Sequence, residues 1–259
     1  MIPSLFVSHG APTLALDAGD TGAAWAALMQ RLPQPESILV ISAHWETAAP
    51  EVSSADPPKT IHDFGGFPDA LYRIQYPAPG APALAGRVAE LLSAAGFAPT
   101  QHTSRGLDHG AWVPLRCMVP DANIRCTQLS IQTHLGPRHA HAIGRALRPL
   151  RDEGVLILAS GGIVHNLRQL DWKTGDVVTD TGLAWATEFN DWMAERTAAG
   201  DIDALLNYRR LAPHAVQSHP TEEHLLPFYV ALGAGGAARE RIPVGYTYGS
   251  LGMDAYRFN

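Results

Sequence analysis

Short, continuous apolar segments alternate with amphipathic helical patterns along this chain of 259 residues. Uninterrupted apolar runs of about four to eight residues are typical of strands that are buried on both faces. Such runs occupy residues 4–8, 37–42, 125–131 and 155–159, and a weaker candidate lies at 242–248. Strands of this kind, alternating with helices, predict an α/β fold: a single layered domain over residues 1–259, with a central, mostly parallel sheet flanked by helices.

Three segments place apolar side chains on one helix face, at spacings of three and four residues. The sets are Leu84, Val88, Leu91 and Leu92; Ile143, Leu147 and Leu150; and Trp185, Phe189, Trp192 and Met193. The segment 50–82 is rich in Pro, Gly and Asp and lacks apolar periodicity. It predicts a long surface excursion, and long loops in compact domains are usually functional or disordered.

Composition excludes several classes of partner. The net charge is −6 and no block of Lys or Arg is present, so we expect no nucleic acid partner. No apolar run is long enough for a membrane-spanning helix, so we expect no membrane partner. The two cysteines, Cys117 and Cys126, are too few for a disulfide framework, and the N-terminus lacks the charged leader of a signal peptide. We expect free thiols and a cytoplasmic protein.

Histidines follow three of the predicted strands. His9 follows the first, His44 the second, and His165 the strand that begins at residue 155. Ligands bind outside the carboxyl ends of strands in open α/β sheets, so these imidazoles are expected to converge on one rim. Gly10 and the pair at 161–162 would let the backbone turn there. The alternative for each histidine is a structural role in a loop.

Other polar clusters are candidates for the same rim. The segment 219–224 contains His219 and His224 and precedes an apolar run that predicts a helix; Glu222 and Glu223 are interpreted as residues that favour its positive end. An Asp-His pair, Asp108 and His109, lies between glycines and is suited to presenting an imidazole into a cleft, or to an ordinary Asx-type turn. The segment 60–68, which contains His62, is suited to covering a pocket or to forming a well-packed loop.

A set of short motifs runs in order through nearly the whole chain. It comprises Ser8-His9-Gly10-Ala11-Pro12, Ser42-Ala43-His44-Trp45, Ile61-His62-Asp63-Phe64-Gly65-Gly66-Phe67-Pro68, Leu71-Tyr72, Tyr76-Pro77-Ala78-Pro79-Gly80, Asp108-His109-Gly110, Val164-His165-Asn166-Leu167 and Pro220-Thr221-Glu222-Glu223-His224. Together these motifs resemble the 4,5-DOPA dioxygenase extradiol family, within the class III extradiol ring-cleavage superfamily.

The resemblance implies a metal site at the C-terminal rim of the strands, and it implies roles for particular residues. His9, His44 and His224 match the metal ligands. His165 matches an active-site histidine that is an acid/base or a further, fourth ligand. His109 matches a pocket residue that contacts substrate and assists catalysis. Asp108 and His62, in the adjoining motifs, are candidate substrate-binding residues.

The resemblance also implies a function: a non-haem extradiol dioxygenase that opens a DOPA-like catechol with O2 to give a semialdehyde. We expect one divalent metal per chain, with Fe(II) for activity. Three histidines with a vacant position also suit Zn(II), so Zn(II) in a purified sample is the alternative. The sequence leaves open which catechol is cleaved, 2,3 or 4,5 cleavage, and whether an oligomer forms. A zinc-dependent hydrolase and a non-enzymatic binding or scaffold protein on the same fold are the alternatives.

Overall fold

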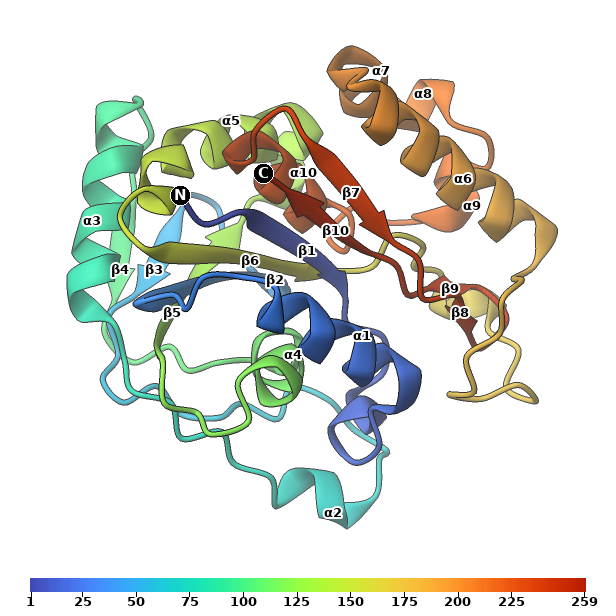
Figure 1. Ribbon diagram of the computed structural model, residues 1–259, viewed down its shortest axis with the longest axis horizontal. Coiled ribbons are helices and arrows are strands. Elements are labelled where there is room, and N and C mark those ends of the chain that lie inside the picture. The colour runs from blue at the N-terminus through green and yellow to red at the C-terminus, as the bar shows by residue number, and fades with distance from the viewer.

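The central feature of the computed structural model, which describes residues 1–259, is a sheet of eight strands in the order β4-β3-β5-β2-β6-β1-β10-β7 (Figure 1). The strands are β1 (Ser4–Ser8), β2 (Ser37–Glu46), β3 (Glu51–Ser53), β4 (Thr100–His102), β5 (Arg125–Ile131), β6 (Val155–Gly161), β7 (Arg239–Ile242) and β10 (Ala255–Phe258). The central four, β5-β2-β6-β1, pair in parallel, whereas β10 and β7 extend the sheet antiparallel. The predicted α/β class with a mostly parallel sheet is confirmed.

Helices cover both faces of this sheet (Figure 1). They are α1 (Gly19–Gln30), α2 (Asp69–Tyr72), α3 (Pro82–Ala94), α4 (His109–Met118), α5 (Gly136–Leu147), α6 (Ala184–Ala199), α7 (Ile202–Leu206), α8 (Tyr208–Leu211), α9 (Ala215–Ser218) and α10 (Leu226–Ala234). Short 3-10 helices lie at Pro12–Ala15, Thr133–Leu135, Arg148–Arg151 and Leu167–Gln169. A second, small sheet pairs β8 (Tyr246–Thr247) with β9 (Leu251–Gly252).

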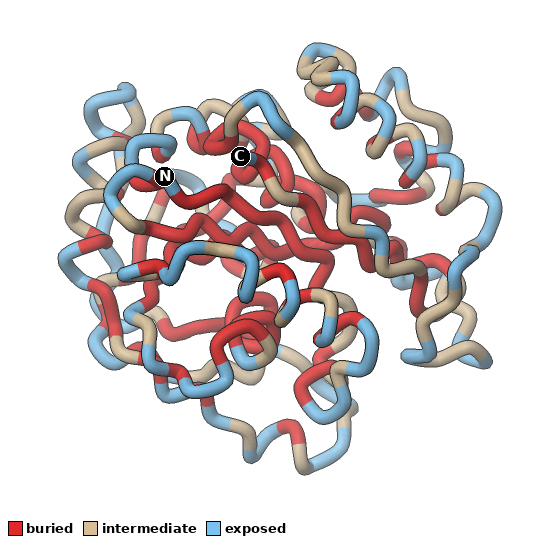
Figure 2. The backbone as a smooth tube through the Cα atoms, in the orientation of Figure 1, coloured by how far each residue is buried: buried red, intermediate tan, exposed pale blue.

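Alternate residues of each central strand enter two separate hydrophobic cores. In β1, Phe6 packs into the core that also holds α3, α5 and α10, whereas Leu5 and Val7 pack into the core that holds α1 and α4. Successive side chains of a strand point to opposite faces, so a strand with helices on both sides must be apolar at every position. Figure 2 shows that the strands at the centre of the molecule are buried. Burial on both faces explains why these strands are continuous apolar runs in the sequence.

Most predicted elements are present, with three differences. β2 continues to Glu46, so His44 lies within the strand and not after it. The candidate strand at 242–248 is wrong as a single element: Ile242 ends β7, and β8 belongs to the other sheet, because Gly245 between them has φ +112°. Leu150 lies beyond α5, in the following 3-10 helix.

The long excursion over 50–82 contains β3 and α2 and packs against the molecule. Leu71, Tyr76 and Ala78 are buried in the core of α1 and α4, and the Tyr76 hydroxyl donates to the carbonyl oxygen of Val119 at 2.9 Å. The excursion is therefore anchored at the side of the sheet where α4 lies.

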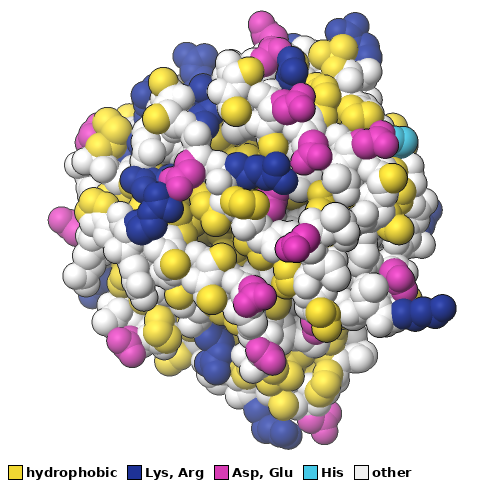
Figure 3. Space-filling model, turned by 45° about the vertical axis from the view of Figure 1, so that its right-hand side comes forward, with side chains coloured by type: hydrophobic (Ala, Val, Ile, Leu, Met, Phe, Trp, Pro, Cys, Tyr) yellow, Lys and Arg dark blue, Asp and Glu magenta, His cyan; other side chains and the backbone are white.

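Two further observations concern the charge of the surface and the length of the helices. On the face shown in Figure 3, Lys and Arg side chains are scattered among Asp and Glu, so this face presents no continuous basic strip. No helix combines the length and the apolar character that crossing a membrane requires.

The contact between α5 and α10 gives a stability prediction. A Cβ added to Gly144 in α5 would collide with the carbonyl oxygen of Val230 in α10, so the backbones of the two helices would have to separate. Gly144→Ala should lower the free energy of unfolding by about 1–3 kcal/mol, as overpacking does. In α3, a Cβ on Gly86 meets nothing within 4 Å. Gly86→Ala is the control and should raise stability by about 0.5–1 kcal/mol. Urea denaturation measures both, and equal stability of the two variants would contradict this packing.

Candidate metal centre

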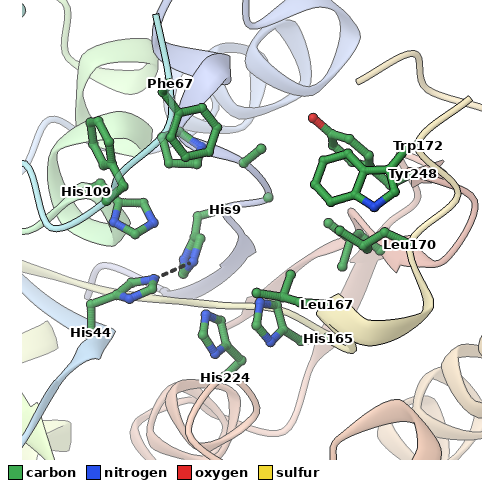
Figure 4. Close-up of a pocket in the computed structure, with 15 residues that line it drawn as sticks. His9, His44, Phe67, His109, His165, Leu167, Leu170, Trp172, His224 and Tyr248 are labelled. Carbon is green, nitrogen blue, oxygen red and sulfur yellow. Dashed lines mark hydrogen bonds between the residues drawn. The ribbon is translucent and has the colours of Figure 1, made fainter. Parts of the chain in front are cut away.

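Five histidines from five different parts of the chain line one cavity of about 280 Å³ (Figure 4). His9 follows β1, His44 lies in β2, His109 begins α4, His165 follows β6 and His224 precedes α10. The carboxyl ends of β1, β2 and β6 meet at this rim, as strand placement predicts. The structure therefore brings together His9, His44, His109, His165 and His224, whereas the candidates His62 and His219 do not line the cavity.

Three of these imidazoles form a set that can hold a metal ion. The ligand atoms of His9, His44 and His224 all lie within 4.8 Å of one another, and His44 Nε2 is 3.0 Å from His9 Nε2. Two nitrogens bound to one ion at about 2.0–2.1 Å are separated by about 2.9 Å at an angle of 90° and by about 3.4 Å at the tetrahedral angle. The separation of these nitrogens therefore fits a shared ion.

Each of the three imidazoles has an outer polar neighbour at Nδ1. The pairs are His9 with the Ser160 hydroxyl at 2.9 Å, His224 with Glu223 Oε1 at 3.0 Å, and His44 with Asp63 Oδ2 at 3.8 Å. Such partners fix the ring orientation and tautomer of metal-binding histidines. In His9 and His224 the outer hydrogen bond engages Nδ1, so Nε2 is the nitrogen that remains for the ion. The His44–Asp63 pair is too long for a hydrogen bond.

Asp63 also holds His109, a role that the sequence analysis missed. Asp63 Oδ1 accepts hydrogen bonds from the backbone N–H and from Nδ1–H of His109, both at 2.9 Å. Burial alone would raise the pKa of Asp63, but the hydrogen bonds from His109 outweigh it and lower the pKa to about 2. The carboxylate is therefore ionised and can only accept hydrogen bonds, so His109 Nδ1 is the donor. The other ring nitrogen, Nε2, is left available to a ligand in the cavity. The two residues are far apart in the sequence, and no spacing rule connects them.

Glu223 contacts a histidine of the site, which corrects the expectation that it only favours the positive end of the helix. Its carboxylate accepts from His224 Nδ1–H and also lies in a possible ligand group with His165. The reason is local: residues 221–225 form turns, and α10 begins only at Leu226. Helical spacing, which would direct the side chains of Glu223 and His224 apart, does not apply there.

Two predicted substrate-binding residues, Asp108 and His62, do not line the cavity. The Asp108 carboxylate is fully buried, caps α4 by accepting from the N–H of Ala111 at 3.2 Å, and pairs with Arg105 at 3.0 Å. His62 Nε2–H donates to the carbonyl oxygen of Ile74 at 2.9 Å. The structure therefore supports the helix-cap and packed-loop alternatives for these two side chains. The neighbouring residues Phe64 and Phe67 do line the cavity, so the segment 60–68 covers one side of it.

The glycines at the rim act in two ways. Gly10 has φ +58°, which confirms the predicted turn after His9. Gly161 instead allows the end of β6 to approach the backbone of His224 closely, because a Cβ at position 161 would collide with the carbonyl oxygen of His224. That same oxygen accepts from the N–H of Gly162 at 2.8 Å, which fixes the end of β6 against His224.

Burial favours the neutral form of four imidazoles of the site, those of His9, His44, His165 and His224. It lowers the pKa of His9 and His224 well below 6.5, that of His44 to about 4 and that of His165 to about 3, and repulsion from neighbouring histidines adds to the effect. A neutral imidazole keeps the lone pair that binds a metal. The rings of His165 and His224 stack in parallel, with centroids 3.4 Å apart and an interplanar angle of 8°.

These shifts predict how the metal-free protein responds to pH. The unfolded chain binds protons near pH 6.5, whereas folded His44 and His165 bind them only near pH 4 and pH 3. Their contribution to stability is therefore complete above pH 6.5 and is lost as pH falls toward the folded values. Between pH 6.5 and 5, the free energy of unfolding should fall by about 1.5 kcal/mol for each such histidine. Urea denaturation of the apoprotein measures this, and His44→Gln should reduce the slope. A stability that does not change over this range would contradict the burial of neutral imidazoles.

Comparisons with known proteins agree with this geometry. The family model described as the catalytic LigB subunit of aromatic ring-opening dioxygenase matches residues 4–259. The chain is 40% identical to a 4,5-DOPA dioxygenase extradiol of Beta vulgaris, over 98% of this chain and 96% of that protein. It is 43% identical to a protein of the same name from Escherichia coli K12, over 97% and 93%.

A solved structure shows the same fold. The crystal structure of an uncharacterized protein from Escherichia coli K12 superposes with a TM-score of 0.82 at 34% identity, and the match covers 100% of both chains. The resemblance inferred from the motifs is confirmed, and so is the expectation that the protein is an extradiol, ring-opening enzyme. The chain belongs to the family of the catalytic LigB subunit of aromatic ring-opening dioxygenases.

Proposed function

We propose that this chain, as one catalytic domain over residues 1–259, opens the ring of a DOPA-like catechol with O2 at a single divalent metal. Cleavage occurs beside the two hydroxyls, and both oxygen atoms enter the product, a semialdehyde. The observation that carries the proposal is the set of three neutral imidazoles, His9, His44 and His224, on one wall of an otherwise largely apolar cavity. The names of the relatives, which are 4,5-DOPA dioxygenases, support a catechol as the substrate.

We propose Fe(II) as the working metal. When bound, it supplies a positive charge that favours the catecholate and the redox chemistry that O2 requires. The three-histidine set also accepts Zn(II), but that ion has no redox chemistry. A purified sample that holds Zn(II) is therefore expected to be inactive toward O2.

The stacking of His165 on His224 favours a base over a fourth ligand. A metal lies along a lone pair, in the plane of the imidazole that binds it. The rings of His165 and His224 lie parallel and stacked, so their lone pairs lie in separate planes and His165 would not share an ion that His224 would hold. His165 is neutral near pH 7 and lines the cavity, so it is placed to accept a proton from a catechol hydroxyl.

His109 is the second residue that we assign to holding a proton during the reaction. Its Nδ1–H is held by Asp63, so Nε2 is the atom that contacts substrate. The carboxylate of Asp63 also fixes the orientation and tautomer of His109, as the carboxylate of a His-Asp pair does elsewhere. His109 therefore positions the substrate and holds a proton during ring opening.

Substitution of single histidines distinguishes a catalytic base from a metal ligand. His165→Ala should lower kcat by about 10²–10⁴ while one metal per chain remains bound. His224→Ala should lose both the metal and the activity. His62, which lies outside the cavity, provides the control, and His62→Ala should keep both. Metal analysis with steady-state kinetics distinguishes the cases, and loss of metal in His165→Ala would make His165 a ligand.

Oxygen uptake tests the function itself. The protein is stripped of metal, reloaded anaerobically with Fe(II) or Zn(II), and mixed with L-DOPA or another catechol in air-saturated buffer. Consumption of O2 together with a new visible absorbance is expected in the iron sample only. Absence of uptake with all catechols, despite one bound Fe(II) per chain, would contradict the proposal.

A further inference from the structure

His219 lies behind the cavity, in the segment that leads to His224. Its side chain is fully buried and does not line the cavity. Burial lowers the pKa of His219 to about 4, so the ring is neutral near pH 7. Nε2 is 3.0 Å from the carbonyl oxygen of Ile163. Because a carbonyl oxygen can only accept a hydrogen bond, Nε2 carries the proton and donates it to this bond.

The other ring nitrogen of His219 has no partner. Nδ1 is buried and makes no hydrogen bond. The ring lies among aromatic side chains, with centroids 5.5 Å from Phe189 and 6.3 Å from Tyr208. An unsatisfied polar atom in such surroundings costs about 1–3 kcal/mol, a cost that an apolar side chain would not carry. A buried atom of this kind requires an explanation, and the single bond that the ring makes, to Ile163, supplies one.

Ile163 belongs to the segment 162–166, which follows β6, carries His165 and lies outside any helix or strand. Bonds to other parts of the chain therefore determine where this segment lies. The N–H of Ile163 donates to the Ser8 hydroxyl at 3.1 Å, and the carbonyl oxygen of Ile163 accepts from His219. The backbone is thus held on both sides of Ile163, two residues before His165.

The segment that contains His219 also holds the backbone at His165 itself. The N–H of His165 donates to the carbonyl oxygen of Ser218 at 3.0 Å. Asn166 Nδ2 donates to the carbonyl oxygen of Gln217 at 2.6 Å. In this set of contacts His219 is the residue that contributes a side chain from the 217–219 side, so it is the contact that a substitution can remove.

His224 is held by different contacts. Its carbonyl oxygen accepts from the N–H of Gly162, and its Nδ1–H donates to Glu223. Neither bond involves His219. The stacking of His165 on His224, with centroids 3.4 Å apart, therefore depends on a second set of contacts that holds His165 (Figure 4). Loss of the bond from His219 should displace the ring of His165 and leave His224 in place.

We propose that His219 is a positioning residue for His165. Its Nε2–H, bonded to the carbonyl oxygen of Ile163, fixes the segment 162–166 so that the His165 ring stacks on His224 and lines the cavity. The inference rests on the proposed function, in which His165 is the base. A displacement of about 1 Å at a reacting group can lower a rate by about 10²-fold, so a single bond at this distance from the metal is sufficient to matter.

Two polar replacements separate the hydrogen bond from the packing of the ring. In His219→Gln the amide nitrogen takes the place of Nε2 and keeps the donor, whereas in His219→Asn it takes the place of Nδ1 and does not reach Ile163. His219→Asn should lower kcat by about 10–10²-fold, with KM changed by less than about two-fold and one metal per chain still bound. His219→Gln should keep kcat near the wild-type value. An equal loss in both variants, or no loss in His219→Asn, would overturn the inference.

His219→Leu is a second variant without the donor. It fills the buried space and leaves no unpartnered ring nitrogen, so its fold should survive even if that of His219→Asn does not. Its kcat should fall as in His219→Asn, and a wild-type kcat would overturn the inference.

The double variant with His165→Ala tests whether His219 acts through His165. With the base already removed, loss of the donor at position 219 should change kcat by less than about two-fold relative to His165→Ala alone. A general structural role would lower kcat by the same factor in both backgrounds, and that result would overturn the inference.

Crystals of the Zn(II)-loaded variants give a measurement that does not require turnover. Without the donor, the His165 ring should leave its stack on His224 while the three metal ligands stay in place, and His219→Gln should keep the stack. A His165 ring that remains stacked without the donor would overturn the inference, even if kcat falls. Absence of turnover in the Fe(II)-loaded wild-type protein would contradict only the proposed function, because the crystals still test the position of His165.

Discussion

The convergence of three buried imidazoles on one point is the interaction on which the rest of the site depends. His9 and His44 are carried by β1 and β2, the two strands that flank β6, and the end of β6 packs closely against the backbone of His224. Burial makes the charged form of each ring unfavourable, so each neutral ring keeps a lone pair that can bind a metal. Three such rings around one point provide the ligands for a divalent cation.

The acidic side chains around the centre are arranged to support the imidazoles from outside. Glu223 holds His224, and Asp63 holds His109 while lying near His44. The cavity is consequently left with neutral, hydrogen-bonded rings on one wall and apolar side chains on the other. A metal bound there would be the principal charge that faces a ligand.

The sequence predicted the layers and part of the site because both follow from local pattern. Apolar runs identify strands that are buried on both faces, and the ends of parallel strands lie at one rim, which placed His9, His44 and His165 together. His224 has no such signal and was found through the family resemblance. Asp63 was missed because it acts on a histidine 46 residues away, and Asp108 was assigned to substrate although it caps a helix. β10 was missed because it is short and includes a charged residue, Arg257.

The central claim is that one divalent ion is held by His9, His44 and His224 at the rim of the sheet. Crystals of the Fe(II)-loaded protein, grown without oxygen and measured at the iron absorption edge, test it most directly. The account predicts a single anomalous peak per chain, about 2.0–2.2 Å from one nitrogen of each of these three residues. A peak held instead by His44, Asp63 and His109, or by His165, Glu223 and His224, would contradict it.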